Sequence, residues 1–105
     1  MTTFADLSHP LALLRLLAAD HPNLPAVDVH ISRHSPDRLT LEVHGSLSTF
    51  EAWREALNID PAAIRRNLQS ADTTMVLSGF GTLADCNIQL VGYSSNLALL
   101  TAVAA

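Results

Sequence analysis

The stretch from Ala26 to Gly45, AVDVHISRHSPDRLTLEVHG, constrains the fold more than any other part of the sequence. Apolar and polar residues alternate in each half of it. The apolar positions are Val27, Val29 and Ile31, then Leu39, Leu41 and Val43. Because successive strand residues point to opposite faces, each half predicts a strand with one apolar and one polar face. Ser35-Pro36-Asp37 between the halves is typical of a turn, so the stretch predicts a β-hairpin.

The alternation also predicts how the two strands pair. A three-residue turn sets Ile31 opposite Leu41 on one face, and His30 opposite Glu42 on the other. A slip of one residue would set apolar side chains against polar ones. The two faces of the hairpin are therefore well defined, and the apolar face needs a cover.

The segment before the hairpin predicts a helix over residues 9–20. Ser8 is suited to the N-cap and Pro10 to the first turn, and His21-Pro22 ends the helix. Leucines lie on most sides of this helix, which predicts burial on more than one side. The second cover is either the apolar C-terminal segment 96–105 or another copy of the chain.

The segment after the hairpin predicts a second helix over residues 49–57. Ser48 and Glu51 have the spacing of a capping box, in which each side chain accepts from a free backbone N–H. Phe50, Trp53 and Leu57 follow at helical spacing on one face. This aromatic stripe is expected to pack on the apolar face of the hairpin.

A second hairpin is predicted from residues 73–80 and 86–93, with a turn around Gly81-Thr82. Its inner face is expected to hold Met75, Leu77, Cys86, Ile88 and Leu90. Its outer face carries four apolar or aromatic residues among polar ones, and exposed patches of this kind mark contact surfaces. The predicted interaction residues are Val76, Phe80, Val91 and Tyr93.

Together these elements predict one α+β domain over residues 1–105, of a length that supports a single modest core. An antiparallel sheet, made of two hairpins or a meander, packs on two main helices in the order α-β-β-α-(α/β)-β-β. Residues 61–70 are open between helix and strand, with a helix favoured at the start and an edge strand from Ile64.

Composition narrows the classes of function. No apolar run is long enough to cross a membrane, and the N-terminus lacks the basic region of a secretory signal, which predicts a cytoplasmic location. The single Cys86 excludes an internal disulfide. The net charge of −4 disfavours nucleic-acid binding by the whole surface. No cofactor motif and no catalytic motif occurs in the sequence, so no cofactor is predicted.

The polar face of the first hairpin gathers residues that bind metals or protons. Imidazoles and carboxylates on adjacent strands suit a divalent ion such as zinc. A histidine beside a carboxylate also suits a pH-responsive surface, because imidazole titrates near neutrality. The competing interpretation is a solvated face with cross-strand pairs. The residues are His30, His44, Glu42 and Asp28.

The segment 53–68, WREALNIDPAAIRRNL, resembles the helix-turn-helix of bacterial repressors. That resemblance implies a recognition helix from Pro61, with Arg65, Arg66 and Asn67 available to DNA. Arg54 and Asn67 depart from the pattern, since a small and an apolar residue are expected there. DNA binding is therefore an alternative function, with the acidic net charge against it.

Over most of its length the chain resembles small actinobacterial α+β proteins, some of them linked to mobile elements. The resembling stretches are HPLALLRLLAADHP, RLTLEVHG and ADCNIQLVGYS. The resemblance implies two helices and two hairpins but brings no established activity.

The leading hypothesis is a non-enzymatic protein-interaction module that forms a homo-oligomer. Its contact surface is either the outer face of the sheet or the leucine-rich helix 9–20. The DNA-binding segment and the histidine-rich face are the two alternatives.

Overall fold

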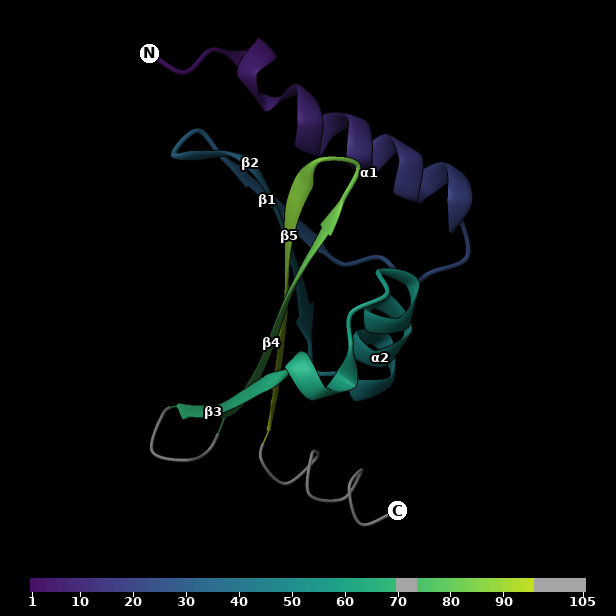
Figure 1. Cartoon of the computed structure of the whole chain (residues 1–105). Coiled ribbons are helices and arrows are strands. Elements are labelled where there is room, and N and C mark those ends of the chain that lie inside the picture. Colours follow the sequence, from purple (N-terminus) through teal and green to yellow (C-terminus); the bar gives the residue numbers. More distant parts are fainter. Residues whose placement is uncertain (70–73, 96–105) are drawn as a thin grey trace.

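Two β-hairpins are joined side by side in the computed structural model, which describes residues 1–69 and 74–95 (Figure 1). The strands β1 and β2 form the first hairpin, and β4 and β5 form the second. In chain order the elements are η1 (Phe4–Leu7), α1 (Ser8–Asp20), β1 (Asp28–Ser32), β2 (Ser35–His44), α2 (Leu47–Ala56), η2 (Pro61–Ala63), β3 (Arg65–Gln69), β4 (Thr74–Leu83) and β5 (Cys86–Ser95).

The five strands form one sheet in the order β1-β2-β5-β4-β3. Every neighbouring pair is antiparallel except β2 and β5, which are parallel. The predicted α+β class, with a mostly antiparallel sheet and two main helices, is confirmed. The parallel pair is not predicted by either hairpin pattern. It requires a long crossover, which here runs through α2, η2, β3 and β4.

Both helices lie on the same side of the sheet (Figure 1). Alternate residues of β2 and β5 point toward them, as the period-2 pattern predicts. The core between helices and sheet contains Leu13 and Leu17 of α1, Phe50 of α2, Leu39, Leu41 and Val43 of β2, and Cys86, Ile88 and Leu90 of β5. The predicted inner face is therefore confirmed. The aromatic stripe faces the core as predicted, but α2 packs chiefly on β5 of the second hairpin, where the Phe50 ring lies over Gly92, and not on the first hairpin. No described helix is long and apolar enough to cross a membrane.

The turn of the first hairpin differs from the prediction. Arg33 and His34 form the turn, and Ser35-Pro36-Asp37 belong to β2. The Ser32 hydroxyl accepts from the His34 N–H at 3.1 Å and stabilises this tight turn. Pro36 lies between the paired positions Ser35 and Arg38, where its missing N–H breaks no ladder bond.

The register of the first hairpin therefore also differs. Val29 pairs with Leu41 and Asp28 with Glu42, and a bulge follows His30. The predicted register is displaced by two residues, and an even displacement keeps every side chain on its predicted face.

The turn of the second hairpin lies at Ala84-Asp85, not at Gly81-Thr82. Both turn residues have positive φ, 49° and 61°, as a two-residue type I′ turn requires. Gly79 and Gly81 lie inside β4 instead. A Cβ on Gly79 would lie 2.5 Å from Ile64 Cδ1, so the Ile64 side chain packs in its present position because this strand residue is a glycine.

The two helices begin near the predicted positions but use other caps. The α1 helix follows the turn η1 directly, so Ser8 is its first residue and its hydroxyl donates to the Ala5 carbonyl. The predicted Ser8 N-cap is therefore wrong. The α2 helix is capped by Ser46, whose hydroxyl accepts from the Thr49 N–H at 3.2 Å. The predicted cap at Ser48 is wrong because Gly45, at φ 79°, already turns the chain into the helix.

The leucine-rich helix α1 is buried on one side only, the side that carries Leu13 and Leu17. Leu11 and Leu16 keep 38% and 43% of their surface exposed. Burial on a second side is thus not provided within the described part of the chain. The segment 96–105, one of its two predicted covers, lies outside the described residues.

The segment from residue 61, predicted as either helix or strand, contains a short helical turn followed by a strand. Pro61–Ala63 form a single 3-10 turn, with the Asp60 carboxylate accepting from the Ala62 N–H at 2.9 Å. An edge strand follows from Arg65. This is the favoured order of the prediction, and Ile64 is where the strand conformation begins.

We expect Gly92→Ala to destabilise the fold more than Gly81→Ala. A Cβ on Gly92 would lie 2.7 Å from Cδ2 of the buried Phe50 ring, whereas one on Gly81 meets nothing closer than 3.3 Å. Overpacking of this kind costs about 1–3 kcal/mol. Urea unfolding of both variants measures the difference. Equal stability of the two would contradict this account of how α2 packs on β5.

Candidate functional site

The face of the sheet opposite the two helices is covered by no described helix. Its residues follow from the strand registers, because directly paired residues share a face. Three rows cross the sheet from β2 to β4. They are His44-Tyr93-Val76, Glu42-Val91-Ser78 and Thr40-Gln89-Phe80. We call this surface the outer face.

The four predicted interaction residues all lie on the outer face, on the adjacent strands β4 and β5. Val76 pairs with Tyr93, and Val91 is the next outer residue of β5. Val76 and Val91 are buried but are not part of the core beneath the helices. Phe80 lies further along β4 with 56% of its surface exposed. The centre of the outer face is therefore uncharged and carries two valines and two aromatic residues on neighbouring strands, together with the polar Ser78 and Gln89.

His44 stacks on Tyr93, with ring centroids 5.0 Å apart and planes inclined by 10°. The two rings come from different hairpins and meet through the parallel pairing of β2 with β5. This contact is not among those that the sequence predicts. It carries no local signal, because alternation within a strand does not reveal which strand lies beside it.

The structure brings together all four residues of the predicted histidine-carboxylate cluster. His30 Nε2 lies 3.5 Å from Glu42 Oε1. His44 Nε2 lies 3.5 Å from Asp28 Oδ2 and 3.4 Å from Glu42 Oε2. Both imidazoles and the Asp28 carboxylate are more than half exposed, and pairs of this kind contribute only about 0–1 kcal/mol each.

In the structure the cluster consists of imidazole–carboxylate pairs. No group of three or more His, Cys, Asp or Glu among the described residues is arranged to hold a metal ion. A hollow of about 290 Å³ opens beside it, lined by Asp28, Glu42 and His44 together with Ser46 and Thr49. The cluster thus forms an acidic edge of the outer face, and its pH response stays a prediction.

The predicted recognition helix from Pro61 is wrong. Residues Arg65–Gln69 form strand β3, paired with β4 from Arg65↔Ser78 onward. The Ile64 side chain packs over Gly79 and holds this segment against the sheet. Asn58 in the turn adopts the left-handed conformation, at φ 57°, which asparagine tolerates better than most residues. Segment 53–68 is therefore a helix, a turn and an edge strand.

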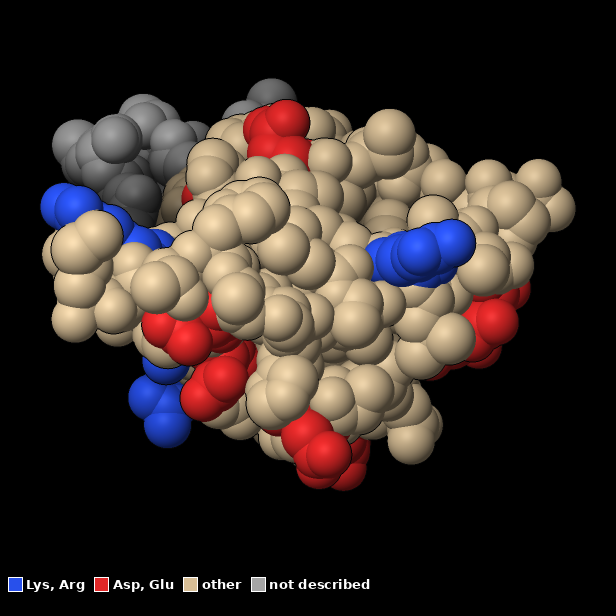
Figure 2. Space-filling model, turned by 90° about the horizontal axis from the view of Figure 1, so that it is seen from above, with Lys and Arg blue, Asp and Glu red and all other residues tan. Residues whose placement is uncertain are grey.

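The three residues predicted to contact DNA do not share a face of β3, because successive strand residues point to opposite sides. Arg65 and Asn67 lie on the outer face, paired with Ser78 and Val76, whereas Arg66 points to the other side. The face seen in Figure 2 carries isolated charged side chains of both signs and no continuous basic patch. Arg65 thus provides a single positive charge at the β3 edge of the outer face.

Arg54, the residue that departs from the helix-turn-helix pattern, has a structural role. Its Nη1 donates to the Ile59 carbonyl at 2.7 Å, and its Nε donates to the Glu51 carboxylate at 2.8 Å. It therefore ties the end of α2 to the connection that leads to β3.

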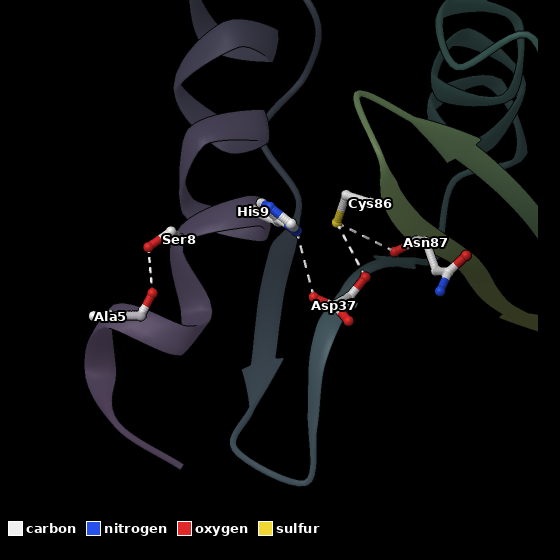
Figure 3. A network of polar contacts seen from close by, with 6 residues as sticks. All are labelled: Ala5, Ser8, His9, Asp37, Cys86 and Asn87. Carbon is white, nitrogen blue, oxygen red and sulfur yellow. Dashed lines mark hydrogen bonds and ion pairs between the residues drawn. The ribbon is translucent and has the colours of Figure 1, made fainter.

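Cys86 lies at the other end of the sheet in a small polar network (Figure 3). Its thiol donates to the Asp37 carbonyl at 3.3 Å, and the Asp37 carboxylate lies 3.4 Å from His9 Nδ1. The thiol is fully buried. Burial raises the pKa of Cys86 above its usual value, and the charge of Asp37 raises it further. Cys86 is a core residue, as the alternation predicts, and not an activated nucleophile.

We expect Cys86 to react with a thiol reagent only when the protein unfolds, because the folded state buries it and favours its protonated form. Iodoacetamide labelling at pH 8, with and without urea, measures this. The raised pKa also means that the unfolded chain ionises first, so the free energy of unfolding falls as pH rises above the usual thiol pKa. Rapid labelling of the native protein would contradict the buried position.

No family model, no curated protein and no solved structure matches this chain. The resemblance to actinobacterial proteins therefore stays a prediction. The outer face combines a centre with apolar and aromatic residues, an acidic edge on β1 and β2, and one arginine on β3.

Proposed function

We propose that this protein is a non-enzymatic interaction module that self-associates through the outer face of its sheet. The observation that carries the proposal is the apolar centre of that face, where Phe80 and Tyr93 stand beside Val76 and Val91 without a covering helix among the described elements. The partner proposed is a second copy of the chain.

Sheet packing supplies the physical basis. Two sheets that pack face to face lie about 10 Å apart, and their side chains interdigitate between them. Burying apolar surface contributes roughly 25 cal/mol per Å² before the costs of association. An antiparallel sheet that leaves one face in water is usually polar on that face. The exposed Phe80 ring is an exception that a partner sheet would remove from water.

The exposed side of α1 is the competing surface. Leu11 and Leu16 are partly exposed there, and Phe4 of the preceding turn is 77% exposed. These side chains are spread over η1 and α1, and Arg15 interrupts them. The outer face is favoured because its aromatic and apolar residues lie on two adjacent, directly paired strands.

We expect the protein to dimerise in a concentration-dependent way and Phe80→Ser to weaken the dimer by about tenfold or more, since one buried aromatic ring contributes more than 1.4 kcal/mol. Sedimentation velocity from low to high micromolar concentration measures the dissociation constant. Phe4→Ser is the control, because it removes another exposed ring, which belongs to η1 and not to the sheet.

Two results would count against the proposal. A wild-type protein that remains monomeric at high micromolar concentration removes self-association altogether. A dimer that is weakened by Leu11→Gln plus Leu16→Gln, but not by Phe80→Ser, assigns the contact to α1 instead.

A further inference from the structure

We infer that the second copy binds about a two-fold axis parallel to β5, so that Arg65 of each copy faces Asp28 and Glu42 of the other. The inference rests on the proposed self-association and specifies its geometry. It follows from one row of residues that crosses the whole sheet.

This row carries opposite charges at its two ends. Asp28 pairs with Glu42, Glu42 with Val91, Val91 with Ser78, and Ser78 with Arg65. The row therefore runs from two carboxylates on β1 and β2, through the apolar centre, to a guanidinium on β3. Each end lies on an edge of the sheet.

The strand order makes this row complementary to itself. The strand β5 is central, with β1 and β2 on one side and β4 and β3 on the other. A two-fold axis along β5 exchanges β1 with β3 and β2 with β4, and keeps each residue at its height along the strands. The row of one copy then lies over the row of the other copy, in the opposite direction. Val91 meets Val91 of the other copy, and Arg65 meets Asp28 with Glu42 alongside. A closed two-fold contact of this kind uses the same surface on both copies.

The neighbouring rows fit the same arrangement. Tyr93 meets its counterpart beside Val91, and His44 lies over Val76. Phe80 lies over Thr40. Arg38, the remaining charged residue of β2 on this face, pairs with Asn87 and faces Thr82 of the other copy. Within the described outer face, no like charges are brought together.

The other face-to-face arrangement is electrostatically unfavourable. A two-fold axis perpendicular to the strands and parallel to this row would place each strand over the same strand of the other copy. Asp28 and Glu42 would then face Asp28 and Glu42, and Arg65 would face Arg65. Like charges placed across an interface disfavour that arrangement, so the axis along β5 is selected.

The acidic edge also has room for the arginine. The hollow of about 290 Å³ beside Asp28 and Glu42 is lined by both acidic residues and by Ser46 and Thr49, together with the apolar residues Ala26, Val27 and Val43. Arginine is suited to this setting, because its planar guanidinium donates in parallel to carboxylate oxygens.

Charge reversal tests the arrangement. We expect Arg65→Glu alone, and Asp28→Arg alone, each to raise the dissociation constant of its homodimer by about tenfold or more, because both contacts become repulsive. In an equimolar mixture of the two variants both contacts are attractive again, so a heterodimer forms with an affinity near that of the wild type. Native mass spectrometry and sedimentation of the mixture measure this recovery.

Arg66→Glu is the matched control. It reverses the neighbouring charge of the same strand on the opposite side of the sheet, and it should leave the dimer unchanged. Asp28 and Arg65 are both exposed, and thermal melting confirms that their variants fold. Arg65→Gln, which removes the charge without reversing it, should show a smaller loss in the same direction.

The outcomes separate this inference from the proposed function. Recovery in the mixture supports both. A dimer that is weakened by Phe80→Ser but unchanged by Arg65→Glu and by Asp28→Arg overturns the geometry and keeps the outer face as the interface. A mixture that does not recover overturns the geometry as well, and a monomeric wild type overturns both.

Discussion

The parallel pairing of β2 with β5 is the contact on which the rest of the structure depends. It runs from Arg38 with Asn87 to His44 with Tyr93 and joins two hairpins into one sheet. An isolated hairpin is marginally stable in water, and three or more strands with a buried face are needed for stability. The pairing aligns Leu39 and Leu41 with Ile88 and Leu90, so both hairpins contribute to one core under the same two helices.

The same pairing produces the outer face. It places the uncharged strand β5 beside the acidic residues of β2, and it brings His44 onto Tyr93. Residues 28, 42 and 65 are far apart in the chain and fall into one row only because β2, β5 and β4 are neighbours. A surface with opposite charges at its edges is thus a consequence of strand order.

The local parts of the fold could be predicted from the sequence, and the non-local parts could not. Alternation from Val27 to Val43 predicted which side chains lie on the helix side of the sheet, because a strand has a strict period of two. It did not predict their burial, since Val29 of the edge strand β1 keeps 43% of its surface exposed. Both turns were misplaced. Pro36 and Gly81 are common in turns, yet Pro36 lies at a bulge and Gly81 in a strand, whereas Ala84-Asp85 form a turn without glycine. The parallel pair left no trace in either segment, so neither the strand order nor the charged row could be foreseen.

On the outer face, affinity and orientation of the partner depend on different residues. Exposed charge pairs add little affinity, but they reject wrong orientations, whereas apolar burial adds affinity without direction. On the outer face the valines and aromatic rings lie at the centre. The charges lie at the two edges of the sheet, farthest from the central strand β5. Rotating one copy by 180° about the normal to the interface would keep the apolar centre buried. It would also replace each contact between opposite charges at the edges by a contact between like charges. A weak charge at each edge is therefore enough to select one of two otherwise similar pairings.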